Sequence, residues 1–340
     1  MAPARAKLAH VKLAHVKLAR VMLACLLSLG CYVLAGGLLL DRPLTHGALA
    51  AAMQARLDRG AAITGRKLVI LAGSNAPFSH RCETLEAALG APCVNAGVAV
   101  GIGLDYLFAR WAPLLAPGDV LYLPMEPAQY TRSRLATATG PDAAIMARHD
   151  RTILTQLAPD RWLGAAFATD LRGLVMAASE MALARLRFAD PRADAATNQW
   201  GDRIGHTAER AALPALRAMT PIIPDAHAIR DGHGTALIAA FTRAMGARGV
   251  LVIGGLSVGF DDAVLPDAVI DAIAAIYRTN GGHFLTLPNH SRYPRENFFD
   301  GPEHLHEAAQ IAHSALLAAA LAPMLKARRE TLTAAPSDGE

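Results

Sequence analysis

Residues 67–75 read KLVILAGSN, and this stretch decides the fold class. Its apolar run shows no polar alternation, which is typical of a strand buried on both faces of a parallel sheet. The run ends in a tight turn of small residues that leads to Ser74. In open α/β sheets, functional sites lie just beyond the carboxyl ends of the strands. Ser74 is therefore a candidate nucleophile, although an ordinary helix N-cap also explains a serine at this position.

Four further apolar runs bounded by turn residues follow, at 92–96, 119–124, 249–253 and 283–287. Helical patterns separate them, at 83–89, 104–115, 266–279 and 305–322. This alternation predicts an α/β fold with a doubly wound, mostly parallel sheet. Residues from about 130 to 246 are rich in Ala, Leu and Arg, and we expect them to form a helical insertion over the carboxyl edge of the sheet or a second domain.

The basic excess of the chain lies at its N-terminus. Five of the 33 Lys and Arg residues, and none of the 29 acidic ones, fall within residues 1–20, so the remainder is about neutral. Nothing in that remainder indicates a nucleic-acid-binding surface. Residues 21–40 carry no charge, and about 20 apolar residues suffice to cross a bilayer as a helix.

The basic flank predicts a cytoplasmic N-terminus and a domain on the extracytoplasmic, periplasmic side of the inner membrane. A cleavable signal peptide is the alternative, because Ala48, Leu49 and Ala50 form an A-x-A site, but the apolar run exceeds the usual length. The expected organisation is a basic cytoplasmic tail (1–20), a transmembrane anchor (21–40), a stalk (41–65), the α/β domain with its insertion (66–325) and a disordered tail (326–340).

Two cysteines, Cys82 and Cys93, lie outside the anchor and are eleven residues apart. In an oxidising compartment they are candidates for a disulfide, and two separate buried thiols are the alternative. The other two, Cys25 and Cys31, fall within the apolar run.

Two further strand ends carry polar or glycine residues that suit acyl chemistry. Asn95 and Gly97 follow the second run, and a glycine there lets a backbone N–H approach a developing oxyanion. Beyond the last run lie Asp300, His304 and His306, of which a histidine can act as general base toward Ser74. We expect His304 to face Ser74, because His306 falls within the first turn of the helix that follows. No dinucleotide or phosphate-loop motif occurs, so we expect no cofactor. We also expect no metal, because the cluster of Asp225, His227, Asp231 and His233 is more simply explained as a solvated loop than as a metal site.

Taken together, these blocks resemble the SGNH (GDSL-like) hydrolase superfamily. The closest resemblance is to its extracytoplasmic branch, which includes DltD-like proteins and the acyltransferase-like proteins of alginate acetylation. It is carried by LAGSNAPF at 71–78, NAGV at 95–98, PGDV at 117–120 with PME at 124–126, and FD at 299–300 with HL at 304–305. The match covers roughly residues 66–130 and 248–322.

The resemblance implies that Ser74 is the nucleophile, that His304 is the base and that Asp300 supports it. It also implies an oxyanion hole from the backbone N–H groups of Ser74 and Gly97. We further expect Asn75, Asn95 and Glu126 to line the oxyanion or substrate-binding site.

Two departures from the pattern stand out. Gly73 replaces the aspartate of the G-D-S triplet, and Ala72 replaces its glycine. No G-x-N-D block follows the third strand, where Glu126, Gln129 and Tyr130 stand instead. The side-chain oxyanion donor of the superfamily is therefore missing.

The expected function is a membrane-anchored serine esterase or O-acyltransferase that acts on a cell-envelope glycan or an acyl ester. A polytopic membrane acyltransferase is the partner that the resemblance implies. The alternative is a catalytically silent scaffold or glycan-binding module of an envelope-modification complex.

Overall fold

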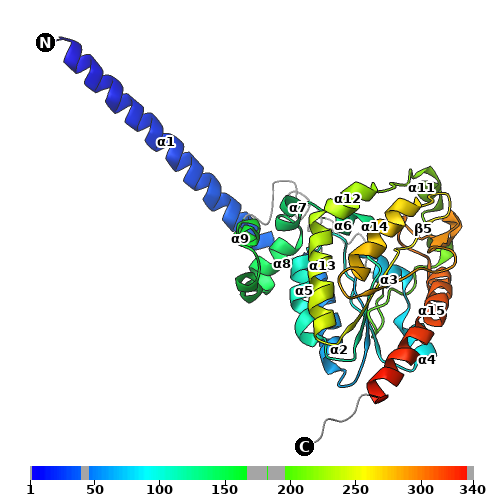
Figure 1. The fold of residues 1–340 in the computed structure, drawn as a ribbon. Coiled ribbons are helices and arrows are strands. Elements are labelled where there is room, and N and C mark those ends of the chain that lie inside the picture. Colours follow the sequence, from blue (N-terminus) through cyan, green and yellow to red (C-terminus); the bar gives the residue numbers. More distant parts are fainter. Residues whose placement is uncertain (1, 40–45, 167–181, 183–195, 335–340) are drawn as a thin grey trace, which may run out of the picture. The chain divides into compact units, whose positions relative to one another are not determined.

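The computed structural model describes residues 2–39, 46–166, 182 and 196–334 (Figure 1). Parts of the expected stalk, insertion and tail, namely 41–45, 167–181, 183–195 and 335–340, lie outside the described residues. The N-terminal helix and the α/β domain belong to different compact units, and each is described by itself.

The N-terminal unit contains the continuous helix α1 (Ala2–Leu39), which includes the five basic residues that precede the apolar run. Its segment from His15 to Ala35 is long and apolar enough to cross a membrane, judged by length and composition. The C-terminal helix α15 (Glu307–Ala334) meets the same test, but Leu317 and Leu321 on it are fully buried in the domain core. We therefore interpret α15 as a core helix.

A five-stranded parallel sheet forms the centre of the α/β domain. Its strands are β1 (Leu68–Ile70), β2 (Cys93–Asn95), β3 (Val120–Leu123), β4 (Leu251–Gly255) and β6 (His283–Leu285), in the order β2-β1-β3-β4-β6. All five predicted strands are thus confirmed, as is the parallel sheet. The order reverses between β1 and β3, and such a switch point opens a crevice at the carboxyl ends of the two strands.

Helices cover both faces of this sheet. Figure 1 shows α5 (Leu104–Trp111) and α13 (His233–Ala247) on one side, and α4 (Cys82–Leu89) and α15 on the other. The part of the chain that the structure describes also contains the α-helices α2 (His46–Ala62), α3 (Asn75–Ser79), α6 (Pro127–Thr131), α7 (Arg134–Ala138), α8 (Asp142–His149), α9 (Pro159–Ala166), α11 (Leu213–Ala218), α12 (Ala226–Asp231) and α14 (Asp267–Arg278).

Three boundaries differ from the expected organisation. The stalk helix α2 inserts Met53 and Leu57 into the domain core, because both are apolar and lie on one face. Helix α13 is the crossover that leads into β4, so the end of the 130–246 stretch belongs to the sheet unit rather than to an insertion. The final helix continues to Ala334, beyond the expected start of the tail, where Arg328 donates a hydrogen bond to the Gly249 carbonyl at 3.0 Å.

A second, two-stranded parallel sheet was not expected from the sequence. It pairs β5 (Gly259–Phe260) with β7 (Arg292–Tyr293). Its aromatic side chains join a small apolar cluster that includes Phe298 and Leu305. This cluster lies beneath the loop that carries Asp300 and His304, and so gives that loop a fixed base.

The structure joins Cys82 and Cys93 in a disulfide, with a Cα–Cα distance of 5.3 Å. Both residues are fully buried, and the bond links the start of α4 to the start of β2. Of the two readings left open by the sequence, the disulfide is therefore the one that the structure shows.

We expect replacement of both cysteines by alanine to lower the free energy of unfolding by about 2–4 kcal/mol, because the bond restricts a short loop in the unfolded chain. Urea unfolding of the full chain in detergent micelles would measure the loss. Cys25→Ala with Cys31→Ala is the matched control, since both of these cysteines are free and exposed. Equal stability of the two double variants would contradict the expectation.

Two buried histidines form a polar contact in the core. His80 and His313 are fully buried, and their Nε2 atoms lie 3.4 Å apart. Nδ1 of His313 lies 2.8 Å from the hydroxyl of Tyr293. Burial lowers the pKa of His80 to about 4, because the charged imidazole loses its water.

This pKa predicts a loss of stability in mild acid. The unfolded chain binds a proton at His80 below pH 6.5, whereas the folded chain resists it down to about pH 4. Stability therefore falls across that window, by about 3 kcal/mol in total for one such group. Urea midpoints at pH 7.5 and 5.0 should differ more for the wild type than for His80→Gln. The same pH-dependent difference in both proteins would rule out His80 as the source.

Candidate active site

Ser74 lies at the switch point of the sheet, where β1 passes into α3. It directly precedes Asn75, the first residue of the helix, and its own backbone is already helical (φ −67°, ψ −22°). Its side chain is only partly buried, unlike those of the fully buried strand residues before it. The hydroxyl is therefore held by a well-packed strand and remains open to solvent.

The loop 298–305 presents His304 to this serine. An isolated antiparallel bridge pairs Phe298 with Leu305, and the His304 N–H donates to the Gly301 carbonyl at 3.2 Å. The Ser79 hydroxyl donates to the Glu303 carbonyl at 2.8 Å, which ties the loop to the end of α3. The loop is thus closed on itself and fixed to the helix that follows Ser74.

The structure brings Ser74, His304 and Asp300 together in one chain of hydrogen bonds. Nε2 of His304 lies 2.9 Å from Oγ of Ser74, and Nδ1 lies 2.6 Å from Oδ1 of Asp300. An ionised carboxylate only accepts hydrogen bonds, so Nδ1 carries the proton and Nε2 is left to accept the serine hydroxyl. This is the arrangement of a nucleophile, a base and a group that orients the base.

The Asp300 carboxyl is suited to remain ionised. Burial raises the pKa of Asp300, whereas the hydrogen bond with His304 and the nearby charges of His304 and Arg203 lower it. The lowering effects are together larger, so the pKa of Asp300 lies below its usual value. An ionised Asp300 stabilises the imidazolium that forms when His304 takes a proton.

His306 has a different role. Its Nδ1 accepts the Ala309 N–H at 3.2 Å, so its side chain caps the start of α15. The expectation that His304 rather than His306 faces Ser74 therefore agrees with the geometry. The helix begins at Glu307 rather than at Leu305, because Leu305 is engaged in the bridge to Phe298.

Gly97 allows a close backbone approach beside Ser74. A Cβ at this position would collide with the Gly73 carbonyl oxygen and the side chain of Ala76. The loop after β2 thus lies against the turn that contains Ser74. The backbone N–H of Gly97 was expected from the sequence to act as an oxyanion donor at this position.

Asn75 and Asn95 differ from the expectation that they line the substrate site. Both are fully buried. The Asn75 amide donates to the Pro124 carbonyl at 2.7 Å, and the Asn95 amide donates to the carbonyls of Ala76 and His80 at 2.9 and 3.0 Å. Asn95 is the last residue of β2, so its side chain points into the packed layer rather than beyond the strand end. These amides position α3 and are not free to contact a substrate.

Glu126 lies at the switch point beside the nucleophile turn. It follows β3, is 6% exposed, and accepts the Asn75 N–H at its Oε1 at 3.1 Å. Burial raises the pKa of Glu126, and the Asn75 N–H and the charge of His304 offset this only in part. A second carboxyl, Glu303, has its pKa raised to about 7 by burial and by the charge of Glu126. The site therefore contains two carboxyls whose pKa values lie above those of exposed glutamates.

Phe78 supports the imidazole from one side. Its ring stacks on that of His304, with centroids 4.1 Å apart and planes 11° from parallel. The guanidinium of Arg203 lies over the Phe78 ring, 5.1 Å from its centroid. Phe78 is one helical turn after Ser74, so the short helix α3 supplies both the nucleophile turn and the surface that orients the base.

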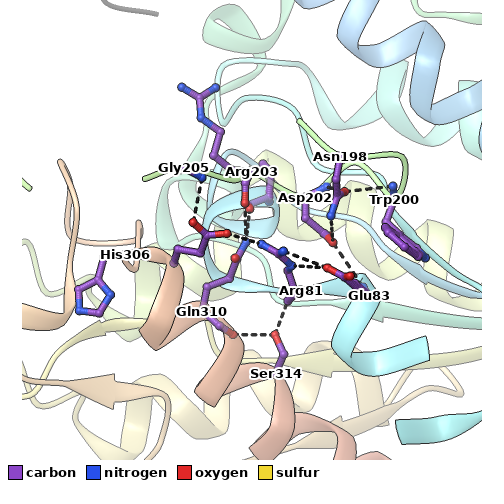
Figure 2. Close-up of polar contacts among 12 residues, drawn as sticks. Arg81, Glu83, Asn198, Trp200, Asp202, Arg203, Gly205, His306, Gln310 and Ser314 are labelled. Atoms are coloured by element: carbon purple, nitrogen blue, oxygen red, sulfur yellow. Dashed lines mark hydrogen bonds and ion pairs between the residues drawn. The ribbon is translucent and has the colours of Figure 1, made fainter. Parts of the chain in front are cut away.

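A buried polar network joins these parts, and the sequence did not reveal it. The Asp202 carboxylate accepts hydrogen bonds from the Cys82 N–H at 2.9 Å and from the Asn95 and Asn198 amides, both at 3.1 Å. Figure 2 shows Asn198 and Asp202 pointing toward one another beside the start of α4. The only signal in the sequence was the stretch NQWGD at 198–202, whose distant partners no local pattern identifies.

An ion pair completes this network at the start of α15. Arg81 contacts Glu307 at 2.8 Å, and Glu307 also accepts the Gly205 N–H at 2.9 Å. Figure 2 shows Arg81 between Glu83 and α15, with the His306 ring apart from the network. Arg81, which follows α3, and Glu307, which begins α15, are thus joined directly.

Comparison of the chain with models of protein families, with curated proteins and with solved structures found no match.

Proposed function

We propose that this chain is a serine ester hydrolase or O-acyltransferase with an SGNH-like fold. The observation that carries the proposal is the hydrogen-bonded chain from Ser74 through His304 to Asp300 at the switch point of a parallel sheet. The placement of the motif blocks supports it, because the nucleophile turn, the Gly97 loop and the histidine loop converge at one edge of that sheet.

The proposed mechanism begins with attack by Oγ of Ser74 on an ester carbonyl, while Nε2 of His304 takes the serine proton. Asp300 stabilises the imidazolium. His304 then returns the proton to the leaving alkoxide, and the acyl group remains on Ser74. Water or a sugar hydroxyl, activated by the same imidazole, finally accepts the acyl group.

Glu126 is the substitute that we propose for the missing side-chain oxyanion donor. Its carboxyl is buried at the nucleophile turn, and its Oε1 already accepts the Asn75 N–H. An ionised carboxylate there would repel the oxyanion, whereas a protonated one can donate to it. The burial that raises the pKa of Glu126 favours the second form.

The proposed location is the extracytoplasmic side of a membrane that α1 spans. The basic residues that precede the apolar part of α1 favour this orientation. The Cys82–Cys93 disulfide suits an oxidising compartment. The acyl acceptor would then be a glycan of the cell envelope, with a polytopic membrane acyltransferase as the partner that supplies the acyl group.

One observation favours the alternative of a silent scaffold. The amides of Asn75 and Asn95 are committed to the fold, so neither supplies the missing oxyanion donor. Loss of one such donor costs about 3–4 kcal/mol in barrier height. If Glu126 does not replace it, the cleft would bind a glycan without turnover.

Labelling by a fluorophosphonate tests the triad. We expect the full chain in detergent to be labelled at Ser74, Ser74→Ala to remain unlabelled, and His304→Ala to react at least about 10³-fold more slowly, because no base activates the hydroxyl. Rates of in-gel labelling provide the measurement.

His306→Ala is the matched control, since it removes a neighbouring imidazole that caps α15 and does not touch Ser74. It should label like the wild type. A folded wild type that does not react, or equal effects of the two histidine variants, would favour the scaffold.

Two variants of Glu126 test its role. If the neutral carboxyl donates to the oxyanion, Glu126→Gln should keep p-nitrophenyl acetate hydrolysis within about tenfold, since an amide N–H can donate. Glu126→Ala should lose about 10²–10³-fold in kcat. The wild type should also lose activity as the pH rises through the raised pKa of Glu126, and the Gln variant should not. A Gln variant as inactive as the Ala variant would show that the carboxylate form is required.

A further inference from the structure

An exposed apolar patch lies on α7 and α9, outside the candidate active site. It consists of Leu135, Trp162 and Leu163, whose exposed fractions are 73%, 53% and 67%. Leu135 directly follows Arg134, which forms an ion pair with Asp160, two residues before Trp162, so the three side chains belong to two helices that are joined at this point. Large exposed apolar side chains in one region of a surface indicate a contact with something other than water.

The outward direction of Trp162 and Leu163 is fixed by the buried face of α9. Arg161, 1% exposed, forms ion pairs with Asp105 at 3.1 Å and with Asp142. Three residues on, Gly164 lies so close to α7 that a Cβ would collide with the Ala138 carbonyl. Positions three apart share a helix face, so the two residues between them must point away from the domain.

The patch has the chemistry of a membrane-interface surface. The indole N–H of Trp162 donates to the Leu154 carbonyl at 2.8 Å, so its polar atom is already satisfied and its ring offers apolar area. Basic side chains lie on α7 and on the turn before α9, namely Arg134, which is paired with Asp160, and the exposed Arg151. Tryptophan and leucine beside basic residues are typical of surfaces that rest in lipid headgroups.

The size of the patch and the tether of the domain favour lipid over a protein partner. A stable protein interface buries roughly 800 Å² on each side, far more than three side chains supply. Only residues 40–45 separate the end of α1 at Leu39 from the start of α2 at His46. Seven residue steps reach at most about 25 Å, so a domain tethered by a membrane-spanning α1 stays near the bilayer surface.

We infer that Leu135, Trp162 and Leu163 dock the α/β domain onto the lipid surface that anchors it. This inference rests on the proposed membrane anchor and is independent of the proposed ester chemistry. Docking would fix the orientation of the domain on the membrane rather than leave it free on its tether.

Quenching of tryptophan fluorescence by brominated lipids tests the inference. The full chain is reconstituted into phosphatidylcholine–phosphatidylglycerol vesicles with and without lipids brominated near the headgroup. The other two tryptophans are the fully buried Trp111 and the partly buried Trp200. We expect at least twofold more quenching in the wild type than in Trp162→Phe.

A second variant tests whether the contact is specific to this patch. Trp162→Phe combined with Leu316→Trp moves the reporter to α15, on the opposite side of the sheet, at a position of similar exposure (45%). It should be quenched no more than Trp162→Phe alone. Equal quenching at position 316 and at position 162 would overturn the inference, because contact would then not be selective.

Flotation of the same vesicles separates the anchor from the patch. A chain that does not float with the vesicles overturns the anchor and, with it, the docking. If the chain floats but the wild type and Trp162→Phe are quenched equally, the docking alone is overturned. The patch would then be a contact for another protein or for residues 167–195. Fluorophosphonate labelling of Ser74 reports on the proposed chemistry separately in either case.

Discussion

The buried carboxylate of Asp202 is the interaction on which the candidate site depends. A buried carboxyl is costly unless several hydrogen bonds compensate for it, and Asp202 receives them from three separate segments, through Cys82, Asn95 and Asn198. Burial nevertheless leaves the pKa of Asp202 above its usual value. The Asn95 amide donates hydrogen bonds both to Asp202 and to the carbonyls of Ala76 and His80. Through this one group, β2, α3, α4 and the segment around residue 200 take fixed positions relative to one another.

The contact between Ser74 and His304 joins positions 230 residues apart, so both sides must be held from outside. The serine side is held by the Asn95 amide and the packed strand β1. The histidine side is held by the Ser79–Glu303 hydrogen bond and by the Arg81–Glu307 ion pair, both of which reach back to the same helical region. Catalytic groups function when such supporting contacts fix them to within about half an ångström. The candidate site is therefore held in place by contacts outside Ser74, His304 and Asp300 themselves.

How much the sequence could predict depended on whether the signal was local. Long apolar runs without alternation predicted all five strands of the main sheet. Because Ser74 and His304 both follow the carboxyl ends of strands, the sequence also predicted that they lie close together. Strands as short as β5 and β7 leave no such run. The role of Asn95 was misjudged because one residue of strand extension turns a side chain from the edge into the packed layer. The role of Asn75 was misjudged because its amide donates to the Pro124 carbonyl, a partner that is distant in sequence. Asp202 could not be predicted, since its partners are distant in sequence.

Under the SGNH-like fold that we propose, the two departures from the superfamily pattern can be understood as one rearrangement. Where the superfamily has an aspartate before the serine, Gly73 leaves a space, and a Cβ built there would collide with Oε1 of Glu126. A side chain at position 73 and the carboxyl of Glu126 therefore exclude one another. The carboxyl that comes from the first strand in the superfamily comes here from the residue after β3, where the missing amide donor would stand. A single residue thus fills both gaps. Because Glu126 is buried, its proton is retained more readily than that of an exposed glutamate.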